Sequence, residues 1–279
     1  MNITAATRVA GVIGSPVGHS LSPALHNAAF SAAGAPWVYV AFEVAPGEAP
    51  RALEAMRVLG LGGLSVTMPH KEQVAAAVDE LDPAAAALRS VNTVVARSDG
   101  RLVGHSTDGA GFVASLREAG ADPAGRRVVV IGAGAAGRSV VDALARAGAA
   151  AIDVVNRDPD RAARAAQLAG AVGSVADPAA IRSADIVVNA TSVGMGSDQL
   201  PFDPALVHAG QVVADLVYHP LETALLREAR LAGAATVDGL GMLVHQAALQ
   251  QQLWLGAMPD ATVMREAALR ELDARTRVA

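Results

Sequence analysis

The sequence "RRVVVIGAGAAGRSVVDALARAGAAAIDVVNRDPDRAARAA" (residues 126–166) decides the fold of the region around it. An apolar run, Val128–Ile131, leads directly into Gly132, Gly134 and Gly137, and a helical pattern then leads to a second apolar run, Ile152–Val155. This order predicts a strand, a glycine turn, a helix and a second strand, which together form a βαβ unit. Glycines at this spacing permit a tight turn, close approach of a pyrophosphate and close packing of the helix on the sheet.

The glycine turn also predicts a binding site for a dinucleotide. The N-terminus of the helix that follows would offer unbonded N–H groups and the positive end of the helix dipole to phosphate groups. The predicted cofactor contacts in the turn are Gly132, Ala133, Gly134, Ala135, Ala136 and Gly137.

The residues after the second strand bear on which dinucleotide is bound. A site that prefers NAD usually has Asp or Glu here, on the ribose 2′-hydroxyl, whereas this chain has Asn156 and Arg157. The planar guanidinium of an arginine can bind two oxygens of a 2′-phosphate at once. Arg161 would face the same phosphate if a helix starts near Asp158, although a solvated arginine pair at a helix start is the alternative. We therefore expect NADP, and NAD is not excluded.

Alternating strand and helix patterns on both sides of this unit predict an α/β protein with two domains. Residues 1–107 are expected to form an N-terminal α/β domain, with strands at 8–16, 37–44 and 62–68 and helices at 22–34 and 49–60. Residues 108–239 are expected to form a Rossmann domain, a doubly wound parallel sheet that binds the dinucleotide. The helical residues 240–279 are expected to return to the first domain and complete it.

Composition excludes several classes of function. The chain has no cysteine, which rules out disulfides and thiolate sites, and its seven histidines lack metal-binding spacing, so no metal is predicted. A net charge of −5 without a basic cluster argues against nucleic acid as a partner. There is no signal peptide and no run of about 20 apolar residues, so we expect no membrane segment and a cytoplasmic protein. Chemistry on a small molecule remains.

Lys71, in "SVTMPHK" (65–71), is the only lysine of the chain, and the other 21 of its 22 basic residues are arginine. A lysine amine can lose its proton when burial or neighbouring charges lower its pKa, whereas arginine stays protonated at any working pH. A role in proton transfer would therefore require lysine at this position. The alternative is a surface cation left over from a general drift towards arginine.

Two helix starts carry further candidates. Ser22 followed by Pro23 predicts a helix with Ser22 as its N-cap, and the hydroxyls of Ser20 and Ser22 would also suit a substrate carboxylate at that helix N-terminus. Asp108 in "GHSTDGAGF" (104–112) precedes another helix. It is either a structural cap or a carboxylate held beside an active site.

A series of motifs that spans almost the whole chain resembles the shikimate dehydrogenase family. The motifs are, in order, "GSPVGHSLSPALHN" (14–27), "SVTMPHK" (65–71), "SVNTVV" (90–95), "GHSTDGAGF" (104–112), "GAGAAG" (132–137), "NR" (156–157), "NATSVGM" (189–195), "DLVYHPLETALL" (215–226) and "GLGMLVHQA" (239–247). The set as a whole is far more specific than any one member.

The resemblance implies that the first domain is a substrate domain, separated from the Rossmann domain by a cleft. It implies reduction of 3-dehydroshikimate to shikimate with NADPH, a step towards chorismate and the aromatic amino acids. Lys71 and Asp108 would form the catalytic pair, with Lys71 giving the carbonyl oxygen a proton as hydride arrives. The residues implied to contact the substrate are Ser20, Ser22, Thr67, Asn92, Tyr218 and Gln246. Those implied to lie along the cofactor are Asn189, Thr191, Met195 and Gly239.

This chain also departs from the family pattern, because Ser65 and Ser106 stand where the family usually has Asn. A quinate/shikimate or aminoshikimate dehydrogenase is one alternative hypothesis. A dinucleotide-sensing binding protein without turnover is another, although a sensor would not need the proton donor Lys71. A monomer and a homodimer are both compatible with the sequence.

Overall fold

The computed structural model describes residues 3–278, which divide into two compact units. Unit 1 contains the described residues up to Thr107 together with those from Gln246 onward, and unit 2 is Asp108–His245. The sequence pattern puts the last boundary at residue 240, at the start of helix α9 (Gly239–Leu255), whereas the contacts divide that helix between His245 and Gln246.

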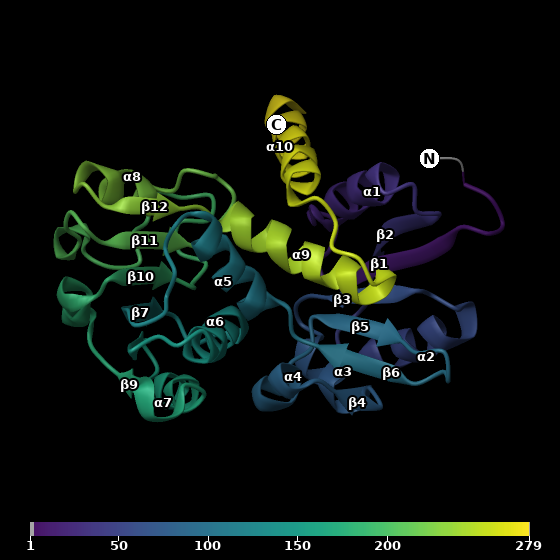
Figure 1. Ribbon diagram of the computed structural model, residues 1–279, viewed down its shortest axis with the longest axis horizontal. Helices are drawn as coiled ribbons and strands as arrows, with labels where there is room; N and C mark the ends of the chain where they lie inside the picture. The colour runs from purple at the N-terminus through teal and green to yellow at the C-terminus, as the bar shows by residue number, and fades with distance from the viewer. Residues whose placement is uncertain (1–2, 279) are drawn as a thin grey trace. The chain divides into compact units, whose positions relative to one another are not determined.

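The sheet of unit 2 is parallel throughout, with the strand order β12-β11-β10-β7-β8-β9. Figure 1 shows part of this ladder as β12, β11, β10 and β7 from top to bottom. The strands are β7 (Arg127–Ile131), β8 (Ala151–Val155), β9 (Gly173–Val175), β10 (Ile186–Asn189), β11 (Val212–Asp215) and β12 (Ala235–Val237). This is the Rossmann order, whose switch point lies between β7 and β10. The predicted doubly wound sheet is confirmed.

Helices cover both faces of this sheet because its strands are apolar on both sides. On β7, Val128 and Val130 pack into one buried cluster, while Val129 and Ile131 pack into another. The helices of unit 2 that precede α9 are α5 (Asp108–Glu118), α6 (Ala135–Arg146), α7 (Pro159–Gln167) and α8 (Ala224–Leu231). Short 3-10 segments are η1 (Gly170–Val172), η2 (Pro178–Ser183) and η3 (Pro204–Leu206).

The sheet of unit 1 is mixed, with the order β2-β1-β3-β5-β6-β4. Strand β5 runs antiparallel to both β3 and β6, and the other pairs are parallel. The strands are β1 (Arg8–Gly14), β2 (Trp37–Glu43), β3 (Gly63–Val66), β4 (Glu80–Leu81), β5 (Thr93–Ala96) and β6 (Leu102–His105). The sequence pattern predicts β1, β2 and β3. Strands β4, β5 and β6 are not predicted by it.

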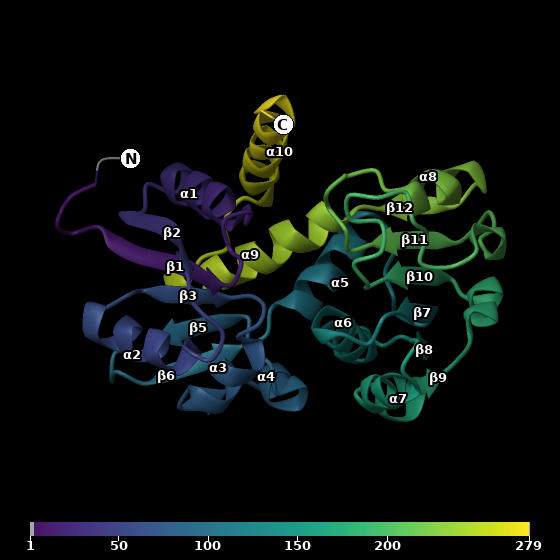
Figure 2. The same ribbon diagram turned by 180° about the vertical axis from the view of Figure 1, so that it is seen from behind.

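Two buried clusters lie on opposite faces of β1 in unit 1. Ala10 and Val12 pack on the side of α1 and α9, and Ile13 packs on the side of α2. The helices are α1 (Ser22–Ala32), α2 (Ala49–Leu59), α3 (Lys71–Ala77), α4 (Pro83–Leu88) and α10 (Ala261–Val278), with the end of α9. Helix α10 packs against α1, and the two lie side by side in Figures 1 and 2. No helix within residues 3–278 is long and apolar enough to cross a bilayer.

Two glycines at the start of β3 make room for the two tryptophans of the chain. An added Cβ at Gly62 would lie 2.3 Å from the ring of Trp37, and one at Gly63 would lie 2.2 Å from Nε1 of Trp254. Trp254 Nε1 donates a hydrogen bond to the carbonyl oxygen of Val94 on β5. A side chain at Gly63 would therefore push α9 away from the sheet, and one at Gly62 would displace the Trp37 ring on β2.

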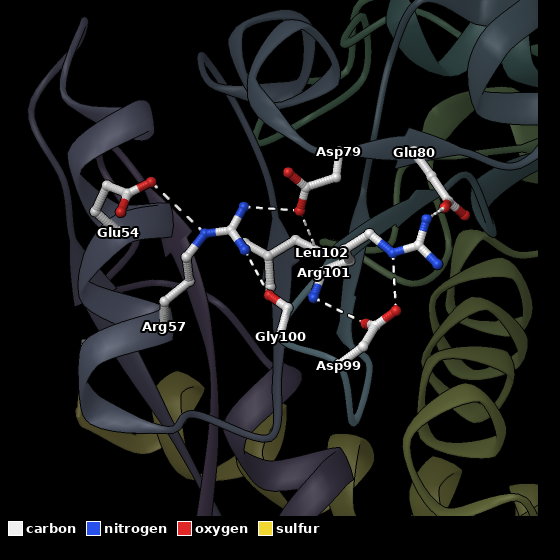
Figure 3. Close-up of polar contacts among 8 residues, drawn as sticks. All are labelled: Glu54, Arg57, Asp79, Glu80, Asp99, Gly100, Arg101 and Leu102. Atoms are coloured by element: carbon white, nitrogen blue, oxygen red, sulfur yellow. Dashed lines mark hydrogen bonds and ion pairs between the residues drawn. The ribbon is translucent and has the colours of Figure 1, made fainter.

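A charged network ties the end of α2 to β4 and β6 (Figure 3). Arg57 donates to Asp79 at 2.8 Å and to the carbonyl oxygen of Gly100 at 2.6 Å, and Asp79 also accepts from the N–H of Leu102 at 2.6 Å. The bond from Leu102, followed by the Arg57 guanidinium, lowers the pKa of Asp79. The network therefore holds the edge strand β4 and its neighbour β6 with both main-chain and ionic contacts.

Candidate functional site

The turn between β7 and α6 presents main chain at a helix N-terminus. Gly132 has a φ of +105°, which disfavours a side chain. Gly134 is the N-cap of α6, and an added Cβ there would have no described atom within 4 Å. An added Cβ at Gly137 would lie 2.0 Å from the carbonyl oxygen of Gly132. The three glycines thus serve a turn, an open surface and close packing, and the open surface at Gly134 fits a pyrophosphate on the N–H groups of α6. Of the alanines, Ala135 is exposed, Ala136 is half-buried and Ala133 is buried.

The segment after β8 holds the glycine turn from the other side. Asn156 Oδ1 accepts from the N–H of Ala133 at 3.2 Å, so this side chain braces the turn. Asp158 is the N-cap of α7, accepts from the N–H of Arg161 at 3.1 Å and forms an ion pair with the Arg161 side chain at 3.4 Å. Arg157 is exposed and makes no hydrogen bond or ion pair with any residue in the described range. Arg157 is therefore the better placed of the two arginines to receive an anion.

The end of β10 is held by buried polar contacts. Asn189 is fully buried, donates to Asp215 Oδ1 at 2.9 Å and accepts from the hydroxyl of Thr191 at 2.7 Å. Burial raises the pKa of Asp215, although a hydrogen bond from Thr223 opposes that shift. An added Cβ at Gly132 would lie 2.8 Å from Cγ2 of Thr191. The structure therefore brings Thr191 against the glycine turn, while the Asn189 side chain supports the loop from inside.

Three further predicted residues lie elsewhere in unit 2. Met195 is exposed on the loop after β10, and Tyr218 is half-buried after β11. Gly239 begins α9, where an added Cβ would lie 2.4 Å from the carbonyl oxygen of Leu216. The glycine at 239 is therefore required for packing.

Lys71 is the first residue of α3 and is half-buried. Its carbonyl oxygen accepts from the N–H of Val91 at 3.0 Å, which brings the segment that contains Asn92 beside it. Thr67 follows β3, and its N–H donates to Ile13 at 3.0 Å. The structure thus brings Lys71, Thr67 and the Asn92 segment to one end of the unit 1 sheet, where β1 and β3 terminate.

Asn92, Thr107 and Gln246 form a buried polar cluster in unit 1. Asn92 Nδ2 donates to the Thr107 hydroxyl at 2.9 Å, and Asn92 Oδ1 accepts from the Thr107 N–H at 2.8 Å. Asn92 Nδ2 also lies 3.4 Å from Gln246 Oε1, and the Thr107 hydroxyl donates to the Gln246 carbonyl oxygen at 3.2 Å. Thr107 is not predicted by the sequence reasoning. Its position in the motif that contains Asp108 is the signal that could have found it.

The prediction that Ser22 caps α1 is wrong. Leu21 occupies the N-cap position, and Ser22 is the first helical residue, because the chain enters helical geometry one residue earlier than the Ser-Pro pattern suggests. The Ser20 hydroxyl accepts from the N–H of Ser22 at 3.2 Å. Arg275 on α10 donates to the carbonyl oxygens of His19 and Ser20 at 2.6 and 3.3 Å, and so fixes the segment before α1.

Asp108 is the first residue of α5, rather than the residue before the helix. Gly109, which follows it, lets α5 pack against α6, since an added Cβ would lie 2.1 Å from the carbonyl oxygen of Ser139. The start of α5 is thus fixed by close helix packing within unit 2.

Unit 1 also has a cavity of about 390 Å³ lined by residues of α2, β5 and β6, together with Arg8. None of the sequence-predicted site residues lines it. Its arginines are engaged by the protein, because Arg57 pairs with Asp79, Arg97 pairs with Glu80 and Arg8 lies over the Trp37 ring. Within the described part of the chain, no group of three or more His, Asp or Glu side chains could hold a metal ion.

A parallel sheet in Rossmann order with a glycine turn at its switch point defines a dinucleotide-binding α/β protein. Models of one protein family match segments of both units. The shikimate dehydrogenase substrate binding domain matches residues 12–94, the shikimate / quinate 5-dehydrogenase domain matches 115–195, and the shikimate 5'-dehydrogenase C-terminal domain matches 239–269. The chain belongs to the shikimate dehydrogenase family.

Individual relatives agree over nearly their full length. A protein of Symbiobacterium thermophilum named shikimate dehydrogenase (NADP(+)) is 48% identical, covering 95% of each chain. A shikimate dehydrogenase crystallised with NADP+ matches with a TM-score of 0.91 and 35% identity, covering 97% of this chain and 98% of the other. The Thermus thermophilus shikimate 5-dehydrogenase, crystallised with NADP(H) and shikimate, matches with a TM-score of 0.89 and 38% identity, covering 95% and 99%.

Proposed function

We propose that this chain is an NADP-dependent shikimate dehydrogenase, an oxidoreductase that reversibly reduces 3-dehydroshikimate to shikimate. The observation that carries the proposal is the 48% identity to a shikimate dehydrogenase (NADP(+)) over 95% of both chains. The reaction supplies shikimate on the way to chorismate and the aromatic amino acids.

The cofactor assignment agrees with the geometry of unit 2. The open surface at Gly134 and the N–H groups of α6 suit the pyrophosphate, and Thr191 lies against the turn. Arg157 is our candidate for the 2′-phosphate, since it is exposed and unpaired among the described residues. Arg161 has a secondary role, because its side chain is paired with Asp158. NADPH, when bound, supplies the hydride.

Proton transfer is assigned to Lys71. Negative charge develops on the carbonyl oxygen as the ketone is reduced, so an ammonium at that oxygen stabilises the charge and delivers the proton. In the reverse direction the neutral amine accepts the proton of the alcohol, which a guanidinium cannot do. Asp108 is proposed to orient the ammonium and hold the reacting hydroxyl.

Substrate recognition is assigned mainly to unit 1. Ser20 and Ser22, at the start of α1, are proposed to bind the carboxylate. Thr67, Asn92 and Gln246 are proposed to bind the ring hydroxyls, and Tyr218 is proposed to line the site. The tight bonding of Asn92 to Thr107 fixes the orientation of its carboxamide before substrate arrives.

The test offers shikimate and quinate to the purified protein, each with NADP+ and with NAD+, and follows nicotinamide absorbance. Shikimate with NADP+ should be oxidised with a kcat/KM at least about tenfold above any other pair, as one well-placed charged contact would give. A higher kcat/KM for quinate would assign the protein to the quinate branch of the family. No reduction with any pair would favour a binding protein that senses dinucleotide.

We also propose that the protein acts in the cytoplasm, since its reaction joins soluble metabolites. Whether it is a monomer or a homodimer stays a prediction. Light scattering on the purified chain distinguishes the two.

A further inference from the structure

A chain of buried hydrogen bonds runs through unit 1 from Tyr39 to Gln246. The Tyr39 hydroxyl donates to Ser65 Oγ at 2.7 Å, and Ser65 Oγ donates to Gln250 Oε1 at 2.7 Å. Gln250 Nε2 then donates to Gln246 Oε1 at 2.8 Å. All four side chains are buried, so the bonds are shielded from water.

The direction of donation along this chain is fixed at its start. Burial raises the pKa of the Tyr39 hydroxyl, and the neighbouring hydroxyls of Ser65 and Ser22 oppose that shift, so Tyr39 keeps its proton to donate. His26 stacks on Tyr39 with 4.3 Å between ring centroids, and its Nε2 lies 3.2 Å from Gln250 Oε1. Burial lowers the pKa of His26 to about 3, so the ring is neutral. Gln250 Oε1 accepts from the Ser65 hydroxyl, and the Nε2–H tautomer of His26 would give it a second donor, while Gln250 Nε2 is turned towards Gln246.

This arrangement determines how Gln246 is oriented. Gln246 Oε1 accepts from Gln250 Nε2 at 2.8 Å and lies 3.4 Å from Asn92 Nδ2. With the oxygen held by two inward donors, the Nε2 group of Gln246 points away from them. Gln246 and Gln250 are one turn apart on α9, so both carboxamides project from the same side of that helix.

We propose that Gln250, oriented by Ser65, is a positioning residue for substrate binding. It holds the Gln246 carboxamide with its oxygen inward, so that the Nε2 group is presented to the ring hydroxyls of the substrate. This inference rests on the proposed function, in which Gln246 binds those hydroxyls. Ser65 contributes to this positioning because its short side chain leaves space for the Gln250 carboxamide and bridges it to the Tyr39 hydroxyl.

A double-mutant cycle tests whether Gln250 acts through Gln246. Gln250→Met keeps the length of the side chain and removes its hydrogen bonds. It should raise the KM for shikimate about tenfold, the usual worth of one oriented hydrogen bond, with kcat and the KM for NADP+ changed less than about threefold. In a Gln246→Ala background, the same substitution should change the KM for shikimate less than about twofold.

Gln251 provides the matched control. It is the next residue of α9, is fully buried, and takes no part in the hydrogen bonds that join Tyr39, Ser65, Gln250 and Gln246. Gln251→Met should leave the KM for shikimate within about twofold of the parent. If Gln250→Met does not fold, Ser65→Ala enters the same cycle, with an expected rise of about threefold that again vanishes without Gln246.

The outcomes distinguish failure of the positioning role of Gln250 from failure of the proposed function. An active parent whose shikimate KM is unaffected by Gln250→Met overturns the positioning role and leaves the proposed function standing. Additive effects of Gln250→Met and Gln246→Ala overturn it as well, because they show that Gln250 acts independently of Gln246. A parent that does not oxidise shikimate overturns the proposed function and this inference with it.

Discussion

The two units build their candidate sites from different material. In unit 2 the site is mostly main chain: a glycine turn and the N-terminus of α6, both contained in one short stretch of sequence. In unit 1 it is made of side chains from separate segments, with Asn92, Thr107 and Gln246 joined by hydrogen bonds. A main-chain site recognises a phosphate group common to many ligands, whereas a side-chain site can distinguish one ring from another. Substitutions in unit 2 should therefore impair cofactor binding, and substitutions in unit 1 should impair recognition of the substrate and its reaction.

The largest effect is expected at Lys71, where substitution should impair turnover but not the binding of the cofactor. Lys71→Met should lower kcat about 10²–10⁴-fold, which is the usual contribution of a positioned acid–base group. The Kd for NADP+ should change less than about threefold, because the dinucleotide site lies in unit 2. Steady-state assays measure kcat, and calorimetry of NADP+ binding measures the Kd.

Lys71→Arg is the control for charge. It keeps a cation but cannot give up its proton at neutral pH, so it should not restore turnover. A Lys71→Met enzyme that keeps most of its kcat would remove Lys71 from the mechanism.

Arg157 and Arg161 sharpen the comparison within unit 2. Arg157→Ala should lower kcat/KM for NADP+ about 10–100-fold, through loss of charge-assisted hydrogen bonds to the 2′-phosphate, and should leave kcat/KM for NAD+ nearly unchanged. Arg161→Ala should have a smaller effect, because that side chain is paired with Asp158. Equal losses for NADP+ and NAD+ in the Arg157 variant would show that it does not contact the 2′-phosphate.

The glycine turn offers a matched pair of substitutions in which a methyl group is added at two positions. Gly134→Ala puts the methyl group in open space, so the fold should keep its melting temperature while the KM for NADP+ rises about tenfold. Gly137→Ala puts it 2.0 Å from a carbonyl oxygen, so the melting temperature should fall by about 4–10 °C. Thermal unfolding of both variants measures the melting temperatures, and steady-state kinetics measures the KM for NADP+. The reverse pattern would contradict the division of roles between these glycines.

The same contrast explains what the sequence could predict. The features of unit 2 are local: an apolar run, spaced glycines and a second run lie within residues 126–166, and Asp158 caps the helix that was expected to begin near it. Strands β5 and β6 in unit 1 are as long as the predicted strand β3, but they follow one another as an antiparallel pair. They were missed because this order breaks the strand–helix alternation on which the prediction rested. The Ser22 cap was wrong by one residue, which is the usual uncertainty at helix ends.

The buried hydrogen bonds from Tyr39 to Gln246 in unit 1 could be predicted only in part from the sequence. The four-residue spacing of Gln246 and Gln250 already indicates that both lie on one side of a helix. The bond between Ser65 and Gln250 joins residues 185 positions apart, and only tertiary packing brings them together. A motif can predict Gln246 as a site residue, but the structure is needed to show what holds its carboxamide in place.

The smallest effect is expected at Asp79, which tests whether the ionic edge of unit 1 contributes to its stability. Asp79→Asn removes the charge and keeps an oxygen for the Leu102 N–H, so at neutral pH the melting temperature should fall by no more than about 3 °C. The folded state lowers the pKa of Asp79, so its stabilising contribution is present above the unfolded-state pKa of about 4 and is lost as the pH falls through the lower folded-state value. The difference between parent and variant should therefore be constant above about pH 5 and shrink below about pH 4.

Asp198 in unit 2 is the matched control for this edge. It accepts from Arg227 at 2.8 Å, the same distance as between Asp79 and Arg57, but its side chain is 85% exposed. Asp198→Asn should shift the melting temperature by less than about 1 °C, because an ion pair in water gains little over its hydrated charges. Equal shifts for the two variants would mean that the ion pair with Arg57 adds no more stability than an exposed pair. A larger shift for Asp79→Asn that also diminishes at high salt would instead assign the added stability to the partly shielded charge at this edge.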